Sequence, residues 1–176
     1  TVTTTSRRTW ETGELALLRD SARKFFDREC VPHEMRWRAQ HPAERNIWNK
    51  AGAAGLLCAS IPEAYGGGGA SFLHEMVICE EQWYTMSTCF SNSVHSGIVA
   101  HYLLAYGSEA QKRRWLPGMA TGEVVAAIAM SEPGAGTDLQ NIRTTARRDG
   151  DHYVLQGSKI FISNGLSSRS LMALPI

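Results

Sequence analysis

Two short segments in the second half of the chain carry residues whose types and spacing could bind a ligand. The first, SEPGAGTD, spans residues 131–138 and follows an apolar run. Gly134 and Gly136 permit positive φ, so successive backbone N–H groups could converge on an anion beside Thr137. A plain Pro-Gly turn explains the same residues, because neither G-x-G-x-x-G nor the Gly-Lys-Ser/Thr of a P-loop is present. By itself, the segment does not separate a phosphate site from a turn.

The second segment, SKIFISNG, spans residues 158–165. If residues 159–163 form a strand, Phe161 and Ser163 project from one face and Ile162 from the other. An aromatic ring beside a hydroxyl suits a flat heteroaromatic ligand, because the ring can stack while the hydroxyl reaches an edge atom. The alternative is that Phe161 fills the core, and the usual burial of Phe favours that alternative from this segment alone.

The elements that must position these segments begin with helices. Apolar residues at helical spacing predict a helix through Leu15–Phe25 that Pro32 stops, and others near residues 43–54, 71–86 and 94–106. We expect the fourth of these helices to end with a left-handed glycine, Gly107. Its expected apolar face consists of Ile98, Val99, Tyr102 and Leu103.

A further helix is predicted by the S-x-x-Q capping box of Ser108 and Gln111, and it should end near residues 117–122. The glycine-rich stretch at residues 61–69 has no strand-to-helix context, so we expect a flexible connector there. Thr137 and Asp138 are natural N-caps for a short turn after them.

The periodicity of the apolar residues changes after Gly122. Residues 124–130 read as a buried strand, and residues 153–155 and 159–163 as further strands of a β-meander with turns between them. The predicted fold class is therefore α+β, with a helical domain over residues 1–121 and the first strands of a β-domain over residues 122–176. Because such a sheet would keep an open edge, the chain reads as a fragment or as one that another chain completes.

Composition excludes several functions. The net charge is +1, which suggests neither nucleic acid nor an anionic membrane as partner, and the apolar runs are too short to span a bilayer. The four cysteines lack C-x-x-C spacing and the histidines lack ligand spacing, so we expect free thiols and no metal site. The N-terminal stretch TVTTTSRRTW faintly resembles a transit peptide, but a frayed tail is the preferred interpretation.

Taken together, the two segments resemble a known family. AIAMSEPGAGTDLQNIRT followed by GSKIFISNG resembles the paired signature of the acyl-CoA dehydrogenases, and SVHSGIVAHYLLAYGSEAQKRRWLPGMATGE resembles the helices that precede it there. The resemblance extends from about Thr12 to Gly165, and the residues of these motifs are most similar to those of the long-chain branch of the family. It implies an all-α N-terminal domain followed by the opening strands of a β-barrel-like middle domain. The family's C-terminal helical bundle is expected to be absent from these residues.

The resemblance also implies ligand-binding roles. Ser131 would offer its hydroxyl to the FAD ring, Thr137 would meet the FAD pyrophosphate and the acyl-CoA, and Ser163 would lie near flavin N5. Phe161 stands where many relatives have Trp and would pack on the flavin. His95 and Val99 would line the acyl pocket, although helix packing explains each of them equally well. The full set implied for the cofactor is Ile128, Ala129, Met130, Ser131, Gly136, Thr137, Phe161, Ile162 and Ser163.

The reaction implied by the resemblance is α,β-dehydrogenation of an acyl-CoA thioester. A glutamate removes the α-proton, a hydride passes to FAD, and electrons then go to an electron-transferring flavoprotein. We expect no catalytic residue here, because the family's glutamate lies beyond the last residue and Glu132 has a structural role. The resemblance also implies a homo-oligomer, which is a tetramer in the full-length family, or a second chain that completes the protein. It implies a bacterial cytoplasmic location or, second to that, the mitochondrial matrix. Alternatives are a non-catalytic interaction protein and, within the family, another flavin oxidation such as that of nitroalkanes.

Overall fold

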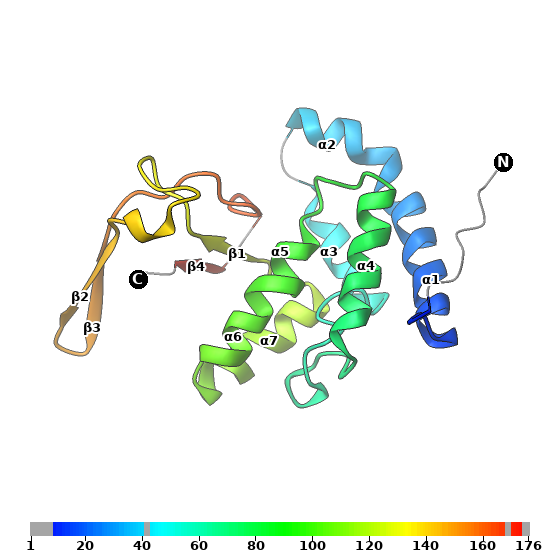
Figure 1. Cartoon of the computed structure of the whole chain (residues 1–176), viewed down its shortest axis with the longest axis horizontal. Coiled ribbons are helices and arrows are strands. Elements are labelled where there is room, and N and C mark those ends of the chain that lie inside the picture. Colours follow the sequence, from blue (N-terminus) through cyan, green and yellow to red (C-terminus); the bar gives the residue numbers. More distant parts are fainter. Residues whose placement is uncertain (1–8, 41–42, 168–169, 174–176) are drawn as a thin grey trace.

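The computed structural model describes residues 9–40, 43–167 and 170–173 and contains helices followed by strands. Figure 1 shows the helices packed together, with strand β1 leading away from them towards the β2–β3 hairpin. The helices are α1 (Gly13–Glu29), α2 (Glu34–Gln40), α3 (Arg45–Ala53), α4 (Phe72–Tyr84), α5 (Asn92–Val94), α6 (Ala100–Tyr106) and α7 (Glu109–Thr121). Short 3-10 turns are η1 (Val31–His33), η2 (Glu63–Tyr65) and η4 (Leu139–Asn141), and η3 (His95–Val99) is a π-helical turn.

The strands form two small pairs. β1 (Ala126–Ala129) pairs in parallel with β4 (Ser170–Ala173), and β2 (Thr145–Asp149) pairs antiparallel with β3 (His152–Gln156). The predicted turn at residues 149–150 joins β2 and β3, with Gly150 at a φ of 60°. The α+β fold class is confirmed: a helical part precedes the strands along the chain.

Helix α1 forms as its sequence predicts. The Thr12 side chain caps it by accepting a hydrogen bond from the Leu15 backbone N–H at 3.3 Å. Leu15, Ala22 and Phe25 are buried at helical spacing, and the helix ends before Pro32. The face that these residues share packs against α4, which lies beside α1.

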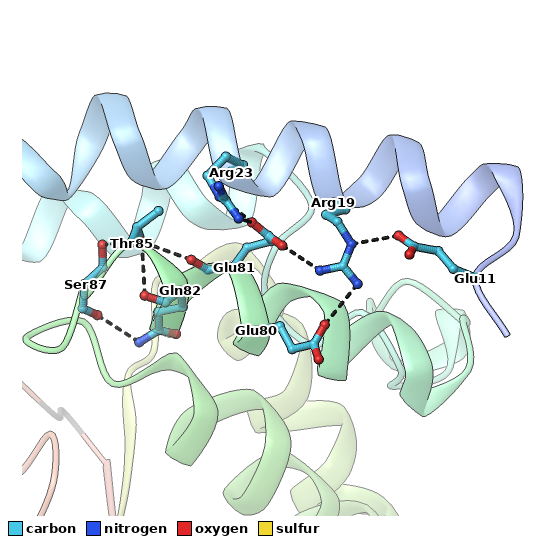
Figure 2. Close-up of polar contacts among 8 residues, drawn as sticks. All are labelled: Glu11, Arg19, Arg23, Glu80, Glu81, Gln82, Thr85 and Ser87. Carbon is cyan, nitrogen blue, oxygen red and sulfur yellow. Dashed lines mark hydrogen bonds and ion pairs between the residues drawn. The ribbon is translucent and has the colours of Figure 1, made fainter. Parts of the chain in front are cut away.

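A cluster of charges joins α1 to α4 beside that apolar contact (Figure 2). Glu81 on α4 has a nearly buried carboxylate that pairs with two arginines of α1: Arg19 at 2.6 Å through one oxygen, and Arg23 through the other. Arg19 also pairs with Glu80 at 2.9 Å and with Glu11 at 2.7 Å. Because Glu81 is only 2% exposed, its carboxylate is surrounded by these arginines rather than by water.

The C-terminal end of α4 is held by neutral hydrogen bonds. The buried amide of Gln82 donates to the carbonyl oxygen of Ser87 at 3.1 Å and to that of Phe90. The Thr85 hydroxyl donates to the Glu81 carbonyl oxygen at 3.0 Å, also drawn in Figure 2. These bonds fold the chain back towards α5 and bury Phe90.

Two hydrophobic clusters form the core. One gathers aromatic residues, including Phe26, Trp37, Trp48 and Phe90. The other joins η3, α6, α7 and β1 through residues such as Val99, Leu103, Leu116, Met119 and Ala126. The second cluster therefore fixes where β1 leaves the helices.

The prediction for the end of α6 was wrong. Gly107 has φ −71° and ψ 148°, an extended conformation, because Ser108 begins α7 at once with the predicted capping box to Gln111. A glycine is still required, since a Cβ at this position would lie 2.5 Å from the carbonyl oxygen of Leu103. The left-handed glycine is instead Gly122, after α7.

The predicted apolar face of residues 98–103 is only half correct. Val99 and Leu103 are buried, whereas Ile98 is 41% and Tyr102 is 37% exposed. The π-helical turn η3 widens the helix by one residue per turn, so the buried face is rotated from the position that a regular helix would give it.

The glycine-rich stretch at residues 61–69 is a tightly packed turn and not the flexible connector that we expected. The Gly68 N–H donates to the Cys58 carbonyl oxygen at 3.2 Å, and the Gly69 N–H to that of Ile61 at 2.9 Å. A Cβ on Gly67 would lie 2.2 Å from the Ile61 carbonyl oxygen. These glycines therefore allow two backbone segments to approach closely.

The other composition-based expectations can be compared with the described residues. All four cysteines are free thiols, and burial raises the pKa of Cys30 and of Cys58 to about 12. Within the described ranges, no helix is long and apolar enough to cross a membrane, and no cluster of three ligating side chains could hold a metal ion. The expected frayed tail falls largely on residues 1–8, outside the described residues.

Candidate functional site

The two segments singled out in the sequence lie next to each other. The Ile160 N–H donates to the Ser131 carbonyl oxygen at 2.9 Å, and the Lys159 ammonium donates to the Met130 carbonyl oxygen at 2.9 Å. β1 ends at Ala129, so the strand delivers Met130 and Ser131 directly to this contact. The predicted ligand residues of both segments are therefore brought to one place from about thirty positions apart.

Glu132 anchors the loop that follows β1. Its carboxylate accepts hydrogen bonds from the backbone N–H of Arg143 at 2.7 Å, from that of Thr144 at 2.9 Å and from the Thr144 hydroxyl, and it pairs with Lys159 at 3.0 Å. The hydrogen bond from Thr144, the other bonds and the Lys159 charge together lower the pKa of Glu132 to about 2. A carboxylate held in this way closes the loop and is a poor base.

The turn at residues 133–138 is exposed to solvent except at Ala135, which is buried. Gly134 and Gly136 are exposed, and a Cβ on either would meet no atom within 4 Å. Neither glycine has positive φ, so the turn does not use the conformational freedom on which the predicted convergence of backbone N–H groups rested, and binding of an anion here stays a prediction. Thr137 is exposed, and Asp138 precedes the short turn η4 without a side-chain cap, since its carboxylate accepts from the Asn141 amide at 3.1 Å.

Residues 159–163 do not form the predicted strand. Phe161 adopts a left-handed conformation with φ 55°, which ends the alternation of faces on which the pairing of Phe161 with Ser163 rested. The Ile160 N–H still donates to the Ser131 carbonyl oxygen, but this isolated bond does not continue into a ladder. Both side chains are nevertheless exposed, while Ile162 is half-buried.

The core interpretation of Phe161 is contradicted, because the residue is 91% exposed. Aromatic residues rarely expose so much apolar surface, and a left-handed backbone costs a non-glycine residue about 1 kcal/mol or more. Such strain occurs most often at functional sites. Ser163 lies two residues further along the chain, and the backbone of Ser131 accepts from the neighbouring Ile160 N–H; both residues carry hydroxyls that can donate to a ring edge.

Asn164 is a residue whose role the sequence did not reveal. Its side-chain amide donates to the carbonyl oxygens of Ser91 at 3.1 Å and Ala126 at 3.2 Å. The only sequence signal at this position is the Asn164-Gly165 pair, which is typical of a turn. The positive φ of Asn164, 63°, fits a turn, but its amide also ties the segment to the helices.

His95 and Val99 are buried in the helical part, with 0% and 1% exposure. The His95 Nε2–H donates to the Met119 carbonyl oxygen at 3.0 Å, and its Nδ1 accepts from the Ala126 N–H at 3.1 Å. Burial lowers the pKa of His95 to about 4, so the ring is neutral at pH 7. Contact of either residue with a substrate stays a prediction, because the described surface exposes neither.

The comparisons with known proteins bear on both parts of the chain. Residues 12–123 match the family model described as acyl-CoA dehydrogenase, N-terminal domain, and residues 127–174 match that of the acyl-CoA dehydrogenase middle domain. The chain belongs to the acyl-CoA dehydrogenase family. The two matched regions meet at the start of β1, where the periodicity of apolar residues changes.

Individual acyl-CoA dehydrogenases are similar over most of the chain. The mitochondrial long-chain specific acyl-CoA dehydrogenase of Sus scrofa is 45% identical over 149 residues, which is 85% of this chain and 35% of that protein. The crystal structure of an acyl-CoA dehydrogenase from Geobacillus kaustophilus has a TM-score of 0.88 and 41% identity, covering 94% of this chain and 43% of that one. The crystal structure of an acyl-CoA dehydrogenase from Bacillus anthracis, complexed with FAD, has a TM-score of 0.86 and 30% identity, covering 93% of this chain and 29% of that one. The chain thus spans about a third of the length of the curated relative.

Proposed function

We propose that these residues form the flavin- and thioester-binding part of an FAD-dependent acyl-CoA dehydrogenase that introduces an α,β double bond into acyl-CoA thioesters. The observation that carries the proposal is the contact between Ser131 and Ile160, which brings both predicted flavin segments together. Family membership supports it, as does the Bacillus anthracis relative, whose structure is complexed with FAD.

The groups available at this contact fit a flavin. An isoalloxazine needs a flat apolar surface and hydrogen-bond donors at its edge, and FAD also carries a pyrophosphate. Phe161 supplies an exposed ring, and Ser163 and Ser131 supply hydroxyl donors. The open turn with Gly136 and Thr137 leaves room for the backbone to approach a phosphate. Ile128, Ala129 and Ile162 would complete the apolar support, and Met130 would contribute its backbone.

A bound flavin would supply the acceptor for the hydride that leaves the β-carbon of the thioester. In this proposal, Phe161 would orient the ring, the Ser163 hydroxyl would donate a hydrogen bond to a ring-edge atom, and Thr137 would contact the phosphate end of cofactor or substrate. We assign no base among the described residues. Glu132 is excluded from that role because its oxygens already accept three hydrogen bonds and pair with Lys159, and its pKa is lowered to about 2.

The remaining parts of the proposal follow from family membership. The substrate would be an acyl-CoA, electrons would leave to an electron-transferring flavoprotein, and the protein would work as an oligomer or with a completing chain. A bacterial cytoplasmic or mitochondrial matrix location fits these partners. The N-terminal domain would end near residue 121 and the middle domain would begin at residue 122.

The direct test is a titration of the chain with FAD, in which quenching of the flavin fluorescence reports binding. We expect saturable binding that Phe161→Ala weakens about tenfold or more, since base–aromatic stacking is worth about 1–3 kcal/mol. The matched control is Tyr153→Ala on β3, because Tyr153 is also an exposed aromatic residue, 67% exposed. Equal effects of the two variants, or no binding of FAD, would contradict the proposal.

A second candidate function is a non-catalytic interaction protein. It is favoured by the β2–β3 hairpin, which is exposed on both faces and carries Tyr153, Val154 and Leu155 at 45–67% exposure. Apolar strands exposed in this way usually pair with another element. A chain that binds no FAD but forms a stable complex through this hairpin, lost in Val154→Lys, would support this second function.

A further inference from the structure

The helices and β1 are joined by polar contacts that meet at one residue, Ala126, at the start of the strand. Its N–H donates to His95 Nδ1 at 3.1 Å, and its carbonyl oxygen accepts from Asn164 Nδ2 at 3.2 Å. Ala126 is 4% exposed, so water cannot readily replace either bond. Two side chains from distant parts of the chain therefore bind the two sides of the same residue.

On the helical side, the orientation of His95 is fixed. Its second ring nitrogen donates to the Met119 carbonyl oxygen on α7 at 3.0 Å, and its ring packs on Trp48 with centroids 5.0 Å apart. A neutral imidazole has one donor and one acceptor, and both are used. Any rotation of the ring would leave a buried N–H or C=O without a partner, so the ring transmits the position of α7 to β1.

On the strand side, Asn164 binds two segments with one amide group. Besides Ala126, it donates to the carbonyl oxygen of Ser91, the residue that precedes α5, at 3.1 Å. It directly follows Ser163 in the chain and stands three residues after Phe161. Its φ of 63° is a conformation that Asn tolerates better than most side chains do.

We infer that His95 and Asn164 are positioning residues that act as one unit through Ala126. Together they set the place of β1, and hence of Met130 and Ser131, and the place of the 161–163 segment relative to the helices. The assignment of a flavin to these segments rests on the proposed function, whereas the hydrogen-bonded junction does not. The alternative is that each side chain merely satisfies a buried polar group on its own.

Amide hydrogen exchange of the 176-residue chain separates the two explanations. The reporters are the N–H groups of Ala126, Ile160 and Gly165, which donate to His95, Ser131 and Ile162. His95→Phe keeps a buried ring without hydrogen bonds, and Asn164→Gly keeps the left-handed backbone without the amide. Each should speed exchange at Ile160 and Gly165 about tenfold, the effect of about 1.4 kcal/mol. The exchange rate in the double variant should exceed that in either single variant by no more than about twofold, because the effects of coupled residues are not additive.

If the increase in exchange rate in the double variant equals the product of the two single increases, the inference is overturned. Unchanged exchange in Asn164→Gly would also overturn it. His95→Gln, which can still donate and accept, should restore slow exchange; it also serves if His95→Phe does not fold. His152→Phe, the same change at an exposed position of β3, is the matched control and should leave all three reporters unchanged.

FAD titration of the same variants tests what the junction positions. Asn164→Gly should weaken FAD binding about tenfold although Phe161 and Ser163 are intact, and His95→Gln should bind like the parent chain. If the parent chain binds FAD and Asn164→Gly binds it equally well, the positioning role is wrong. If the parent chain binds no FAD, the proposed function fails, and the exchange data still decide whether the junction acts as a unit.

Discussion

The Ile160 N–H donates to the Ser131 carbonyl oxygen at 2.9 Å, and this backbone bond joins two segments that the sequence separates. Lys159 strengthens the contact, because its ammonium donates to the Met130 carbonyl oxygen and pairs with Glu132. Strand β1 and the 159–163 segment therefore meet without forming a regular sheet. The candidate flavin site depends on this meeting more than on either segment.

Glu132 is predicted to control the acid sensitivity of this loop. Its pKa is lowered to about 2 in the folded chain, below the value of about 4.5 for a free carboxyl group. The folded state therefore binds fewer protons than the unfolded state, and the stabilisation from Glu132 is present above pH 4.5 and lost as the pH falls towards 2. Thermal unfolding of Glu132→Gln should lie below that of the parent at pH 7, and the difference should shrink across this window. A difference that is independent of pH would contradict the prediction.

His95 is predicted to add a second pH dependence in a higher range. Burial lowers its pKa from 6.5 to about 4, helped by the charge of Arg45, while the bond to Met119 opposes the shift. Because the unfolded chain binds the extra proton first, stability should fall as the pH drops from 6.5 to 4, by up to roughly 3 kcal/mol at about 1.4 kcal/mol per unit. Urea unfolding of His95→Gln should show a flatter curve between these pH values. A slope equal to that of the parent would show that His95 is not the group responsible.

Glu81 is predicted to be the charge on which the packing of α1 against α4 depends. Glu81→Ala leaves Arg19 and Arg23 facing a buried site without their shared carboxylate. We expect a loss of about 2–3 kcal/mol, less than the ~3–5 kcal/mol of a fully buried pair because both guanidinium groups stay partly hydrated. Asp20→Ala, which breaks the exposed pair with Lys24, is the control and should cost less than about 1 kcal/mol. If chemical denaturation shows similar losses in the free energy of unfolding for Glu81→Ala and Asp20→Ala, this ranking is contradicted.

Gly122 is predicted to tolerate no side chain. Its φ is 77°, and a Cβ would lie 2.2 Å from the Trp48 carbonyl oxygen. Gly122→Ala should therefore destabilise the chain by about 3 kcal/mol or more, combining backbone strain with a steric clash. Gly150→Ala isolates the strain, because Gly150 has φ 60° and open space around it, and it should cost about 1 kcal/mol. Equal unfolding midpoints of the two variants would show that the clash is relieved.

Local signals in the sequence predicted local structure well. The capping box of Ser108 and Gln111 formed as expected, because its hydrogen bonds join residues three positions apart, and helix α1 formed where the apolar spacing predicted it. The conformation at Phe161 could not be predicted in this way. The 159–163 segment is in contact with residues about thirty positions earlier, such as Ser131, and no local pattern reveals those contacts.

The same limit applies to Asn164 and His95, whose contacts the sequence pattern does not reveal. Each acts through a backbone group of Ala126, more than thirty positions away, and no spacing rule connects them. The π-helical turn η3 adds a rotation that helical periodicity does not foresee, which moved Ile98 to the surface. The resemblance to the acyl-CoA dehydrogenases supplied the site residues, and the structure supplied the contacts between their segments.

The most direct measurement is the hydrogen-exchange footprint of FAD on this chain. If the two segments form one flavin site, saturating FAD should slow exchange in peptides covering residues 128–137 and 159–163 together, and both protections should rise with the same FAD concentration. Exchange in the β2–β3 hairpin, residues 145–156, should not change. Protection of only one segment, or protection confined to the hairpin, would contradict a shared flavin site.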